Sequence, residues 1–365
     1  MFTKPTLILN ESICRLNIER MVSKANSLGL QLRPHFKTHQ SKEVGSWFRD
    51  YGINRIAVSS VPMAEYFAEG GWDNITIAFP LVKSQAENID NIARKINLQV
   101  TVSSIGNAKQ LANSITSKVE VYIEIDTGQG RSGLQANDFT SINEILQAFT
   151  VNNNINFIGF LSHAGHSYQS NKDSIEDLNA QATQALNQLK KEYFKKYPNL
   201  TISYGDTPTS CLCNCFEGVD ELRPGNFAFF DMQQAVQGVC LPGDIAIALA
   251  CPVVAVYPNR LQSIIWGGAV HLSKDFYTDN FGQKSFGTIC KLNNDYSWSD
   301  PIEGLCLESI SQEHGVIKAK SLKAIEGLSE GDWIAILPAH SCLTADKMGE
   351  YWVKGKGYIS MMRKS

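Results

Sequence analysis

The chain has 365 residues, a length that predicts two to three domains and can bury a large core without disulfide or metal support. Hydrophobic residues make up 43% and charged residues 19%, which is typical of a folded soluble protein and excludes a disordered one. The 33 Lys and Arg residues nearly balance the 36 Asp and Glu residues, so the net charge is −3 and the basic surplus of a nucleic-acid binder is absent. The longest apolar run, residues 245–257, contains Pro252 and is too short to span a membrane. We therefore expect neither nucleic acid nor membrane as a partner.

The N-terminus and the cysteines favour a cytoplasmic location. Residues 1–5 lack the basic-then-apolar pattern of a secretory signal. The nine cysteines form no regular framework, and an odd number leaves at least one thiol unpaired, as in a reducing compartment. Cys211, Cys213 and Cys215 do not match the C-x2-C spacing of structural zinc sites, so we interpret them as buried thiols.

Apolar or β-branched runs alternate with helical segments from the N-terminus to about residue 235. The predicted strands cover residues 32–36, 55–59, 75–79, 98–102, 119–125, 157–162, 200–204 and 226–230. Helical periodicity lies between them, as in residues 41–51, 62–70, 84–96 and 174–197. This alternation predicts an α/β fold of parallel βαβ units, and eight strands close a (β/α)8 barrel. A doubly wound sheet is the alternative, but no G-x-G-x-x-G follows the first strand. We predict a barrel over residues 11–240.

Short apolar runs punctuated by turn signals follow after about residue 240. Pro242-Gly243-Asp244 and Gly331-Asp332 are such signals, and the pattern predicts an all-β domain over residues 241–365. The opening segment, residues 6–10, has no matching helix after it. We therefore expect residues 1–10 to add a strand to this second domain.

Two polar clusters fall at predicted strand ends, where the functional groups of (β/α)8 barrels lie. Lys37 leaves an apolar strand, and desolvation there would favour the neutral amine that Schiff-base chemistry needs. A solvated lysine just past a strand is the alternative. Residues 205–210 contain Thr207 among three hydroxyl side chains and precede a helix, so their backbone N–H groups can bind an anion. A turn with a helix N-cap would look the same.

Arg131 and the pair His163 and His166 lie in two further strand-end clusters. An arginine keeps its proton, so it holds a neighbouring ring nitrogen or phenolate in its electron-rich form. A surface arginine in the Gly-rich segment 128–133 is the alternative. The two imidazoles and Tyr168 can supply acid, base or phosphate contacts, although a histidine that caps a strand is an ordinary structural feature.

His340 and Cys342 form an H-x-C pair near the C-terminus. On an extended strand both side chains would point to one face, because side chains alternate. Imidazole nitrogen and thiolate sulfur favour zinc over magnesium or calcium, and two protein ligands leave positions for water and substrate. A chance occurrence of the pair is the alternative.

Together, these segments resemble the D-threonine aldolase and D-serine dehydratase family, which belongs with alanine racemase among the fold-type III pyridoxal-phosphate enzymes. The resemblance covers nearly the whole chain in order, in the segments RPHFKTH (33–39), GDTPT (205–209), ELRPGNF (221–227), SQEHG (311–315) and PAHSCLT (338–344). It implies pyridoxal 5′-phosphate and Zn2+ as cofactors, with Mn2+ or Mg2+ as alternatives, and a homodimer. It also implies roles for single residues: Lys37 as the Schiff-base lysine, Arg131 near the cofactor ring, Tyr168 beside the phosphate or the lysine, Thr207, Gly225 and Asn226 at the phosphate, and His340 with Cys342 as the metal pair.

The resemblance implies a metal-assisted lyase for D-configured β-hydroxy amino acids. In elimination Lys37 would take the α-proton, whereas in aldol cleavage His163, His166 or a metal-bound water would take the hydroxyl proton. Segment 163–168 looks closer to the dehydratase form, although His166 stands where eukaryotic dehydratases carry asparagine. The cysteine of the metal pair also favours a dehydratase, because the aldolases pair histidine with aspartate.

We therefore expect dehydration of D-serine or D-threonine, with retro-aldol cleavage to glycine and an aldehyde as the alternative. An amino-acid racemase would need a second base opposite Lys37 and would give His340 and Cys342 no role. A non-catalytic pyridoxal-phosphate-binding protein is a further alternative, against which the β domain counts.

Overall fold

The computed structural model describes residues 2–279 and 282–362, and the chain divides into two compact units. The barrel unit comprises residues 20–37 and 45–225, and the β unit comprises the described parts of 1–19, 38–44 and 226–365. Helix α1 (Glu11–Ser27) runs through the division at residues 19 and 20. The division into domains at residues 240 and 241 stays a prediction, and each unit is considered by itself below.

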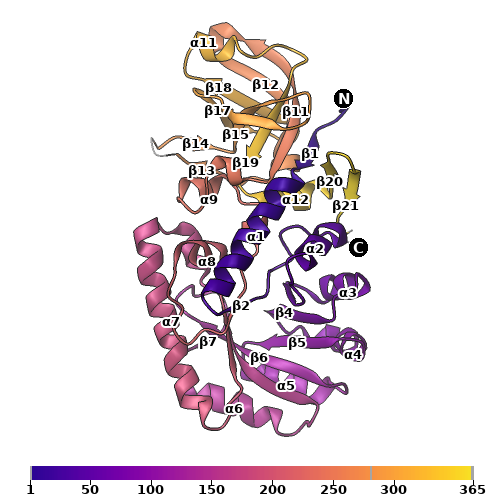
Figure 1. The fold of residues 1–365 in the computed structure, drawn as a ribbon, viewed down its shortest axis with the longest axis vertical. Helices are drawn as coiled ribbons and strands as arrows, with labels where there is room; N and C mark the ends of the chain where they lie inside the picture. The colour runs from indigo at the N-terminus through magenta and orange to yellow at the C-terminus, as the bar shows by residue number, and fades with distance from the viewer. Residues whose placement is uncertain (1, 280–281, 363–365) are drawn as a thin grey trace. The chain divides into compact units, whose positions relative to one another are not determined.

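The sheet of the barrel unit has nine parallel strands, eight of which follow one another in a continuous order (Figure 1). A parallel bridge between His35 and Ala57 joins the chain beyond β2 to β3 and closes the sheet on itself. The predicted (β/α)8 barrel is therefore confirmed. In sheet order the strands are β2 (Gln31–Leu32), β10 (Glu221–Leu222), β9 (Thr201–Tyr204), β8 (Ile155–Ser162), β6 (Val119–Asp126), β5 (Asn97–Val102), β4 (Asn74–Pro80) and β3 (Ile56–Val58), and β7 (Leu134–Gln135) pairs with β6.

Helices lie around the outside of this sheet, between successive strands (Figure 1). Five of them begin at a polar N-cap whose side chain accepts a bond from a backbone N–H three residues later: Ser60, Ser104, Asp138, Asn171 and Asp206. These caps fix where each helix begins. The helices are α2 (Lys42–Arg49), α3 (Val61–Glu69), α4 (Ala86–Ala93), α5 (Ile105–Ser114), α6 (Phe139–Phe149), α7 (Lys172–Phe194) and α8 (Thr207–Leu212).

The eighth strand is not where the sequence predicted it. Residues 226–230 were expected to form it, but Asn226–Ala228 is a short 3-10 turn (η3) and the strand is β10, Glu221–Leu222. A charged residue in a two-residue strand gives a weak signal. Glu221 is nevertheless buried, because its Oε2 accepts a bond from Arg33 Nε at 2.8 Å.

A buried polar network links several barrel strands through their inward side chains. Arg33 also donates from Nη1 to Asn74 Oδ1 at 2.8 Å, and Gln99 Nε2 donates to the same oxygen at 3.2 Å. Gln99 Nε2 reaches Glu120 Oε2 at 2.8 Å as well. The charges of Arg33 and Glu221 thus have partners inside the barrel, as buried ionised groups require.

The opening strand β1 (Thr6–Leu9) lies inside the main sheet of the β unit. It pairs antiparallel with β11 (Ile247–Tyr257) on one side and parallel with β20 (Glu350–Val353) on the other. The strand expected at residues 6–10 is therefore present, although α1 follows it directly. The other long strands are β12 (Gln262–Trp266), β15 (Gly287–Leu292), β16 (Trp298–Pro301), β17 (Leu305–Ile310), β18 (His314–Ala319), β19 (Trp333–Pro338) and β21 (Gly357–Ser360).

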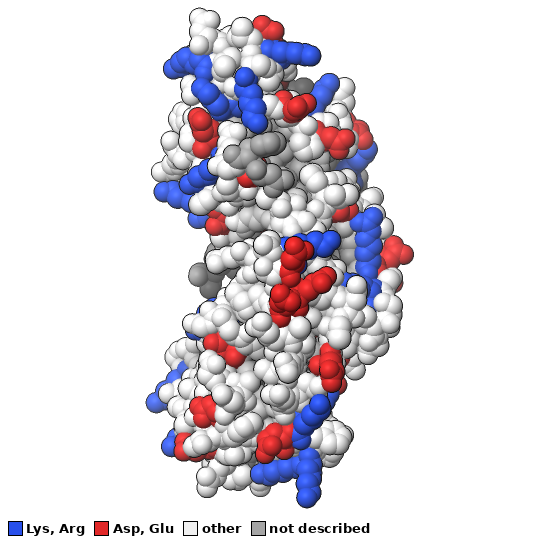
Figure 2. Space-filling model, turned by 90° about the vertical axis from the view of Figure 1, so that its left-hand side faces the viewer, with Lys and Arg blue, Asp and Glu red and all other residues white. Residues whose placement is uncertain are grey.

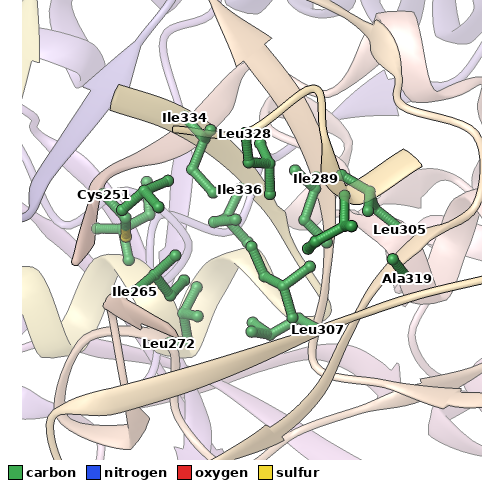
Figure 3. Close-up of a cluster of buried hydrophobic side chains, with 14 residues drawn as sticks. Cys251, Ile265, Leu272, Ile289, Leu305, Leu307, Ala319, Leu328, Ile334 and Ile336 are labelled. Atoms are coloured by element: carbon green, nitrogen blue, oxygen red, sulfur yellow. The ribbon is translucent and has the colours of Figure 1, made fainter. Parts of the chain in front are cut away.

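Short elements join these strands: β13 (Tyr277–Thr278), β14 (Lys284–Ser285), α9 (Met232–Val236), α10 (Ala269–Leu272), α11 (Leu322–Ile325) and α12 (Ser341–Met348). A cluster of buried aliphatic side chains forms the core of the unit (Figure 3). Ile265, Leu307 and Ile336 are fully buried in it, and each such side chain stabilises the fold by about 1.5–3 kcal/mol. The predicted strand-rich C-terminal region is confirmed.

Acidic and basic side chains are interspersed on the face that Figure 2 shows, in keeping with the near-balanced composition. Within the described residues, no helix has both the length and the apolar character needed to cross a membrane. The expectation for the C-x-C-x-C segment is only partly met: Cys213 is buried, Cys211 is half-buried and Cys215 is exposed.

Candidate active site

Lys37 lies in a turn five residues beyond the end of β2, and two residues after the bridge that closes the barrel. Its backbone N–H donates to Nδ1 of His35 at 3.3 Å, so the proton of that imidazole is on Nε2. Burial, followed by the charges of Lys37 and Arg223, holds the pKa of His35 well below its usual value. The Lys37 side chain is exposed, so the desolvation expected from the sequence is absent. Its amine has a neutral imidazole as a neighbour.

His163 directly follows β8 and has a defined tautomer. Its Nδ1 donates to the carbonyl oxygen of Gly205 at 3.0 Å, which leaves the Nε2 lone pair available. Burial lowers the pKa of His163 to about 3, although the bond to Gly205 acts in the opposite direction. The charges of Lys37 and Arg131 add to the lowering. His163 is therefore a neutral proton acceptor at the barrel mouth.

His166 packs against the Gly-rich segment that carries Arg131. It lies in the 3-10 turn η2 (Gly165–Gln169), and a Cβ at Gly128 would approach its Nε2 to 3.5 Å. Its buried Nδ1 has no hydrogen-bond partner among the described residues. Burial lowers the pKa of His166, against the opposing charge of Asp126.

The Gly-rich segment after β6 holds Arg131 in an exposed position. Ser132 Oγ donates to Glu124 Oε1 at 2.8 Å, so a buried carboxylate fixes the residue next to Arg131. Gly133 has φ +101°, and a Cβ there would come within 2.8 Å of the backbone nitrogen of Asp126. The sequence analysis missed Glu124, although a glutamate inside the apolar strand VEVYIEID marks an unusual position.

Asp206 organises the start of helix α8. Its Oδ1 accepts bonds from the backbone N–H of Thr209 at 2.9 Å and from Ser167 Oγ at 2.6 Å. The exposed Tyr168 extends its hydroxyl to this helix start, where it accepts a bond from the backbone N–H of Thr207 at 3.2 Å. Tyr168 and Thr207 therefore meet at one point, and their contacts with a phosphate stay a prediction.

The start of α8 fits an anionic group with several acceptor oxygens. The buried hydroxyls of Thr207 and Ser210 have no hydrogen-bond partner among the described residues. Gly205 has φ +127°, and a Cβ there would approach Ser210 Oγ to 3.1 Å and the backbone nitrogen of Arg223 to 3.2 Å. Two donors without partners beside a glycine cradle match a phosphate.

Arg223 is a buried cation that sequence reasoning missed. Its guanidinium donates to the carbonyl oxygen of Ser162 and to Ser203 Oγ, both at 2.6 Å. Burial lowers its pKa to about 10, so it stays charged at neutral pH. Pro224 and Gly225 follow it, and the Pro224 carbonyl accepts a bond from the backbone N–H of His35 at 2.9 Å.

Asn226 belongs to the β unit, where it lies beside the H-x-C pair. Its Oδ1 accepts bonds from Ser341 Oγ at 2.5 Å and from Cys342 Sγ at 3.5 Å, and its Nδ2 donates to Asp231 at 2.5 Å. A phosphate contact of Gly225 or Asn226 stays a prediction. The structure assigns Asn226 to the surroundings of the thiol.

The H-x-C pair does not lie on an extended strand. Strand β19 ends at Pro338, His340 is the N-cap of α12 with φ −135° and ψ 110°, and Cys342 lies in the first helical turn. The predicted alternation is therefore wrong, yet both side chains belong to the start of the same helix. Burial would lower the pKa of His340, but its bonds to Asp275 and Cys342 outweigh this and raise the pKa to about 11.

The donors of this pair fit a zinc-type ion. One imidazole nitrogen and one sulfur are the ligands that Zn2+ prefers, and they leave positions for water or substrate. Within the described ranges, no three His, Cys, Asp or Glu side chains are arranged to hold a metal ion. His340 Nδ1 lies 3.1 Å from Asp275 Oδ2, a contact that the sequence did not predict.

Family models match both parts of the chain. Residues 10–233 match the model described as alanine racemase, N-terminal domain, and residues 246–354 match a putative serine dehydratase domain. The chain belongs to the alanine racemase N-terminal domain family.

Several relatives of this family member are dehydratases and aldolases. D-threo-3-hydroxyaspartate dehydratase from Delftia sp. (strain HT23) is 28% identical, over 95% of this chain and 93% of that protein. D-serine dehydratase from Dictyostelium discoideum is 27% identical, over 96% and 92% of the two chains. D-threonine aldolase from Arthrobacter sp. is 25% identical, over 92% and 85%. These matches confirm the predicted resemblance and the lyase class.

The solved structure of the Delftia enzyme has the same fold as this alanine racemase family member. It superposes with a TM-score of 0.91 at 26% identity and covers 100% of this chain and 98% of that one. A cysteine-to-alanine variant of that enzyme is described as a metal-free form. Family membership supports pyridoxal phosphate as the cofactor, and this description supports a metal ion.

Proposed function

We propose that this protein is a pyridoxal-phosphate-dependent, metal-assisted dehydratase of D-β-hydroxy amino acids, and that D-serine and threo-3-hydroxy-D-aspartate are its first candidate substrates. The observation that carries the proposal is the position of His340 at the N-cap of α12 and of Cys342 in its first turn. A polarisable sulfur beside an imidazole is suited to Zn2+, and a racemase would give this pair no role. The relatives named as dehydratases span nearly the whole chain and support the same reaction.

The barrel residues would hold the cofactor and move the first proton. Thr207 and Ser210 supply hydroxyl donors for its phosphate, and Arg131 would face its ring. Pyridoxal phosphate supplies an electron sink for negative charge at the substrate Cα. Lys37 Nζ would bind the cofactor carbonyl and then take the α-proton. Because His163 is neutral, its Nε2 can accept a second proton, and His166 is the other candidate for that role.

The β unit would act on the leaving group. His340 and Cys342 would hold the metal ion, which supplies a Lewis acid for the β-hydroxyl. Elimination breaks the Cα–H and Cβ–O bonds, and the hydroxyl leaves as water. A second water molecule is then consumed as ammonia and the 2-oxo acid are released, so that one water leaves and one enters.

Product analysis tests this proposal. We would incubate the purified protein with pyridoxal phosphate and Zn2+ and supply D-serine, D-threonine or threo-3-hydroxy-D-aspartate in separate reactions, with the L-enantiomers as controls. A 2-oxo acid with ammonia is the expected product. Glycine with an aldehyde would replace the proposal by aldol cleavage, to which the Arthrobacter relative points. Interconversion of enantiomers would indicate a racemase, and cofactor binding without turnover would indicate a carrier.

Lys37→Ala tests the cofactor lysine. The variant is expected to lose the absorbance band near the visible edge that the loaded wild-type protein shows, and to lose activity. Lys4→Ala is the matched control, because Lys4 is an exposed lysine of the β unit that pairs with Glu350. Persistence of the band in Lys37→Ala would contradict the assignment.

The proposal also names Zn2+ as the metal, with Mn2+ or Mg2+ as alternatives, and a cytoplasmic homodimer. Metal analysis of protein purified without added metal tests the first point. Light scattering coupled to gel filtration tests the second, and a monomer mass would contradict it.

A further inference from the structure

His340 has a carboxylate partner from a distant part of the sequence. Its Nδ1 lies 3.1 Å from Oδ2 of Asp275, and both side chains are about one-third exposed. The proton of this bond can only come from the imidazole when Asp275 is ionised, so Nδ1 carries it. In the neutral imidazole that binds a metal, the free lone pair is then on Nε2.

A tight turn holds Asp275 in place. The hydroxyl of Ser273 donates to Asp275 Oδ2 at 3.0 Å and accepts the backbone N–H of Asp275 at 3.2 Å. Ser273 follows α10 with φ 69°, in the left-handed region that non-glycine residues seldom adopt. Strained backbone of this kind persists only where the surrounding structure enforces it. The turn therefore sets the direction of the Asp275 carboxylate.

A buried threonine connects the turn that carries Asp275 to the helix start that carries His340. Thr344 Oγ1 on α12 lies 3.2 Å from the carbonyl oxygen of Leu272, which ends α10. The same hydroxyl lies 2.9 Å from the carbonyl oxygen of His340. Thr344 is fully buried, so the turn that carries Asp275 and the helix start that carries His340 are fixed to each other.

We propose that Asp275 is a positioning residue of the metal site, whose carboxylate holds the proton on His340 Nδ1 and directs Nε2 toward the ion. Asp275 acts through His340 in this arrangement, because its Oδ2 lies against Nδ1 of the imidazole. A carboxylate on the far nitrogen orients the ring and makes the near nitrogen a stronger ligand. This inference rests on the proposed function, because it takes His340 and Cys342 as the metal pair.

Zinc affinity of the full-length protein tests the inference. We would titrate metal-free wild type, Asp275→Asn, Asp275→Ala and Asp275→Glu with Zn2+ in competition with a chromophoric chelator. The asparagine and alanine variants are expected to bind Zn2+ about 10–100-fold more weakly, and glutamate is expected to restore part of the loss. Glu308→Gln is the matched control, because Glu308 is exposed in β17 and its replacement changes the net charge as Asp275→Asn does.

Thermal unfolding with and without Zn2+ separates positioning from a structural role. The metal-free Asp275→Asn variant is expected to unfold below the wild-type temperature because it loses the ion pair with His340, and the further rise in Tm on adding Zn2+ is expected to be smaller than in the wild type. Zinc affinity equal to that of the wild type in both Asp275→Asn and Asp275→Ala would overturn the inference while the metal pair stands. Wild-type protein that binds no Zn2+, or binds it equally after Cys342→Ala, would overturn the pair and the inference together.

Discussion

His163 and His340 are both histidines at an element boundary that donate from Nδ1, and their surroundings give them opposite charge. His163 donates to a neutral carbonyl oxygen, and burial lowers its pKa to about 3. For His340 the Asp275 carboxylate and Cys342 overcome the effect of burial, and the pKa rises to about 11. The acceptor thus decides whether an imidazole serves as a neutral base or is held protonated until a metal replaces the proton.

The lowered pKa of His163 predicts that its ring does not titrate near neutrality. Between pH 5 and pH 8 the pH stays above the pKa of about 3, so the imidazole remains neutral with its proton on Nδ1. Nitrogen NMR of histidine-labelled protein is expected to show one resonance pair with the Nδ1–H pattern, unchanged over this range. His163→Gln assigns the pair by removing it. A shift toward the imidazolium pattern near pH 6 would contradict the prediction.

Residues that stand in short sequence motifs could be predicted from the sequence, whereas residues whose partners are distant in the chain could not. Lys37, Thr207 and the H-x-C pair stand in short motifs at strand or helix ends, so a motif search finds them. Asp275 gives no such signal, because the fold alone brings it to His340. The exposure of Lys37 could not be predicted either, since it depends on what the rest of the chain leaves uncovered.

At the scale of elements, the N-cap of helix α8 is Asp206, a buried carboxyl with an unusual pKa. Burial raises the pKa of Asp206 to about 6, although bonds from Ser167 and Thr209 act in the opposite direction. The folded protein therefore binds this proton more tightly than the unfolded chain, whose value is near 3.8. The protonated Asp206 carboxyl therefore makes its full contribution to the free energy of unfolding below about pH 4, and this contribution is lost as the pH rises through 6.

Asp206→Asn is expected to remove this pH dependence while keeping a good N-cap. The free energy of unfolding of the cofactor-free wild type, relative to the variant, is expected to fall by about 2–3 kcal/mol between pH 4 and pH 7. Urea unfolding at four pH values measures it. Asp138→Asn is the matched control, because Asp138 caps α6 in the same way at a half-buried site. A wild-type-to-variant difference that is constant with pH would contradict the prediction.

The bounds of some elements could be predicted from the local sequence pattern, and those of others could not. The periodicity of residues 174–197 predicted most of α7, because its apolar positions recur on one face of a long helix. Strand β10 was missed because Glu221 looks solvent-facing until Arg33, from the other end of the barrel sequence, neutralises it. The prediction of an extended strand through the H-x-C pair was wrong, because the chain begins helix α12 shortly after Pro338. The backbone N–H of Ser341, at the start of this helix, donates to the Asp231 carboxylate at 3.2 Å.

At the scale of the whole molecule, the β unit depends on a strand from the opposite end of the chain. Leu7 in β1 is buried and pairs with Leu249, and the neighbouring Ile8 pairs with Trp352. The C-terminal strands therefore enclose a strand that the first ten residues supply.

Leu7→Ala is expected to destabilise the β unit by about 3 kcal/mol, because it leaves a cavity beside a central strand. Hydrogen exchange read by mass spectrometry is expected to show faster exchange in β11 and β20, with strand β5 of the barrel unit unchanged. Leu16→Ala is the control, since Leu16 on α1 is 43% exposed. Equal exchange in β5 and β11 would contradict the prediction by showing that the units open together.

The position of β1 has a consequence for how the protein is made. A ribosome releases Leu7, Ile8 and Leu9 long before Trp352 and Val353, which pair with their strand. At about 5–20 residues per second, these three apolar side chains wait on the order of tens of seconds for their partners. Residues 45–225 of the barrel unit emerge during that wait and can begin to fold on the nascent chain. The sheet around β1 therefore closes only once Trp352 and Val353 have emerged, and a chain cut short before these residues cannot complete it.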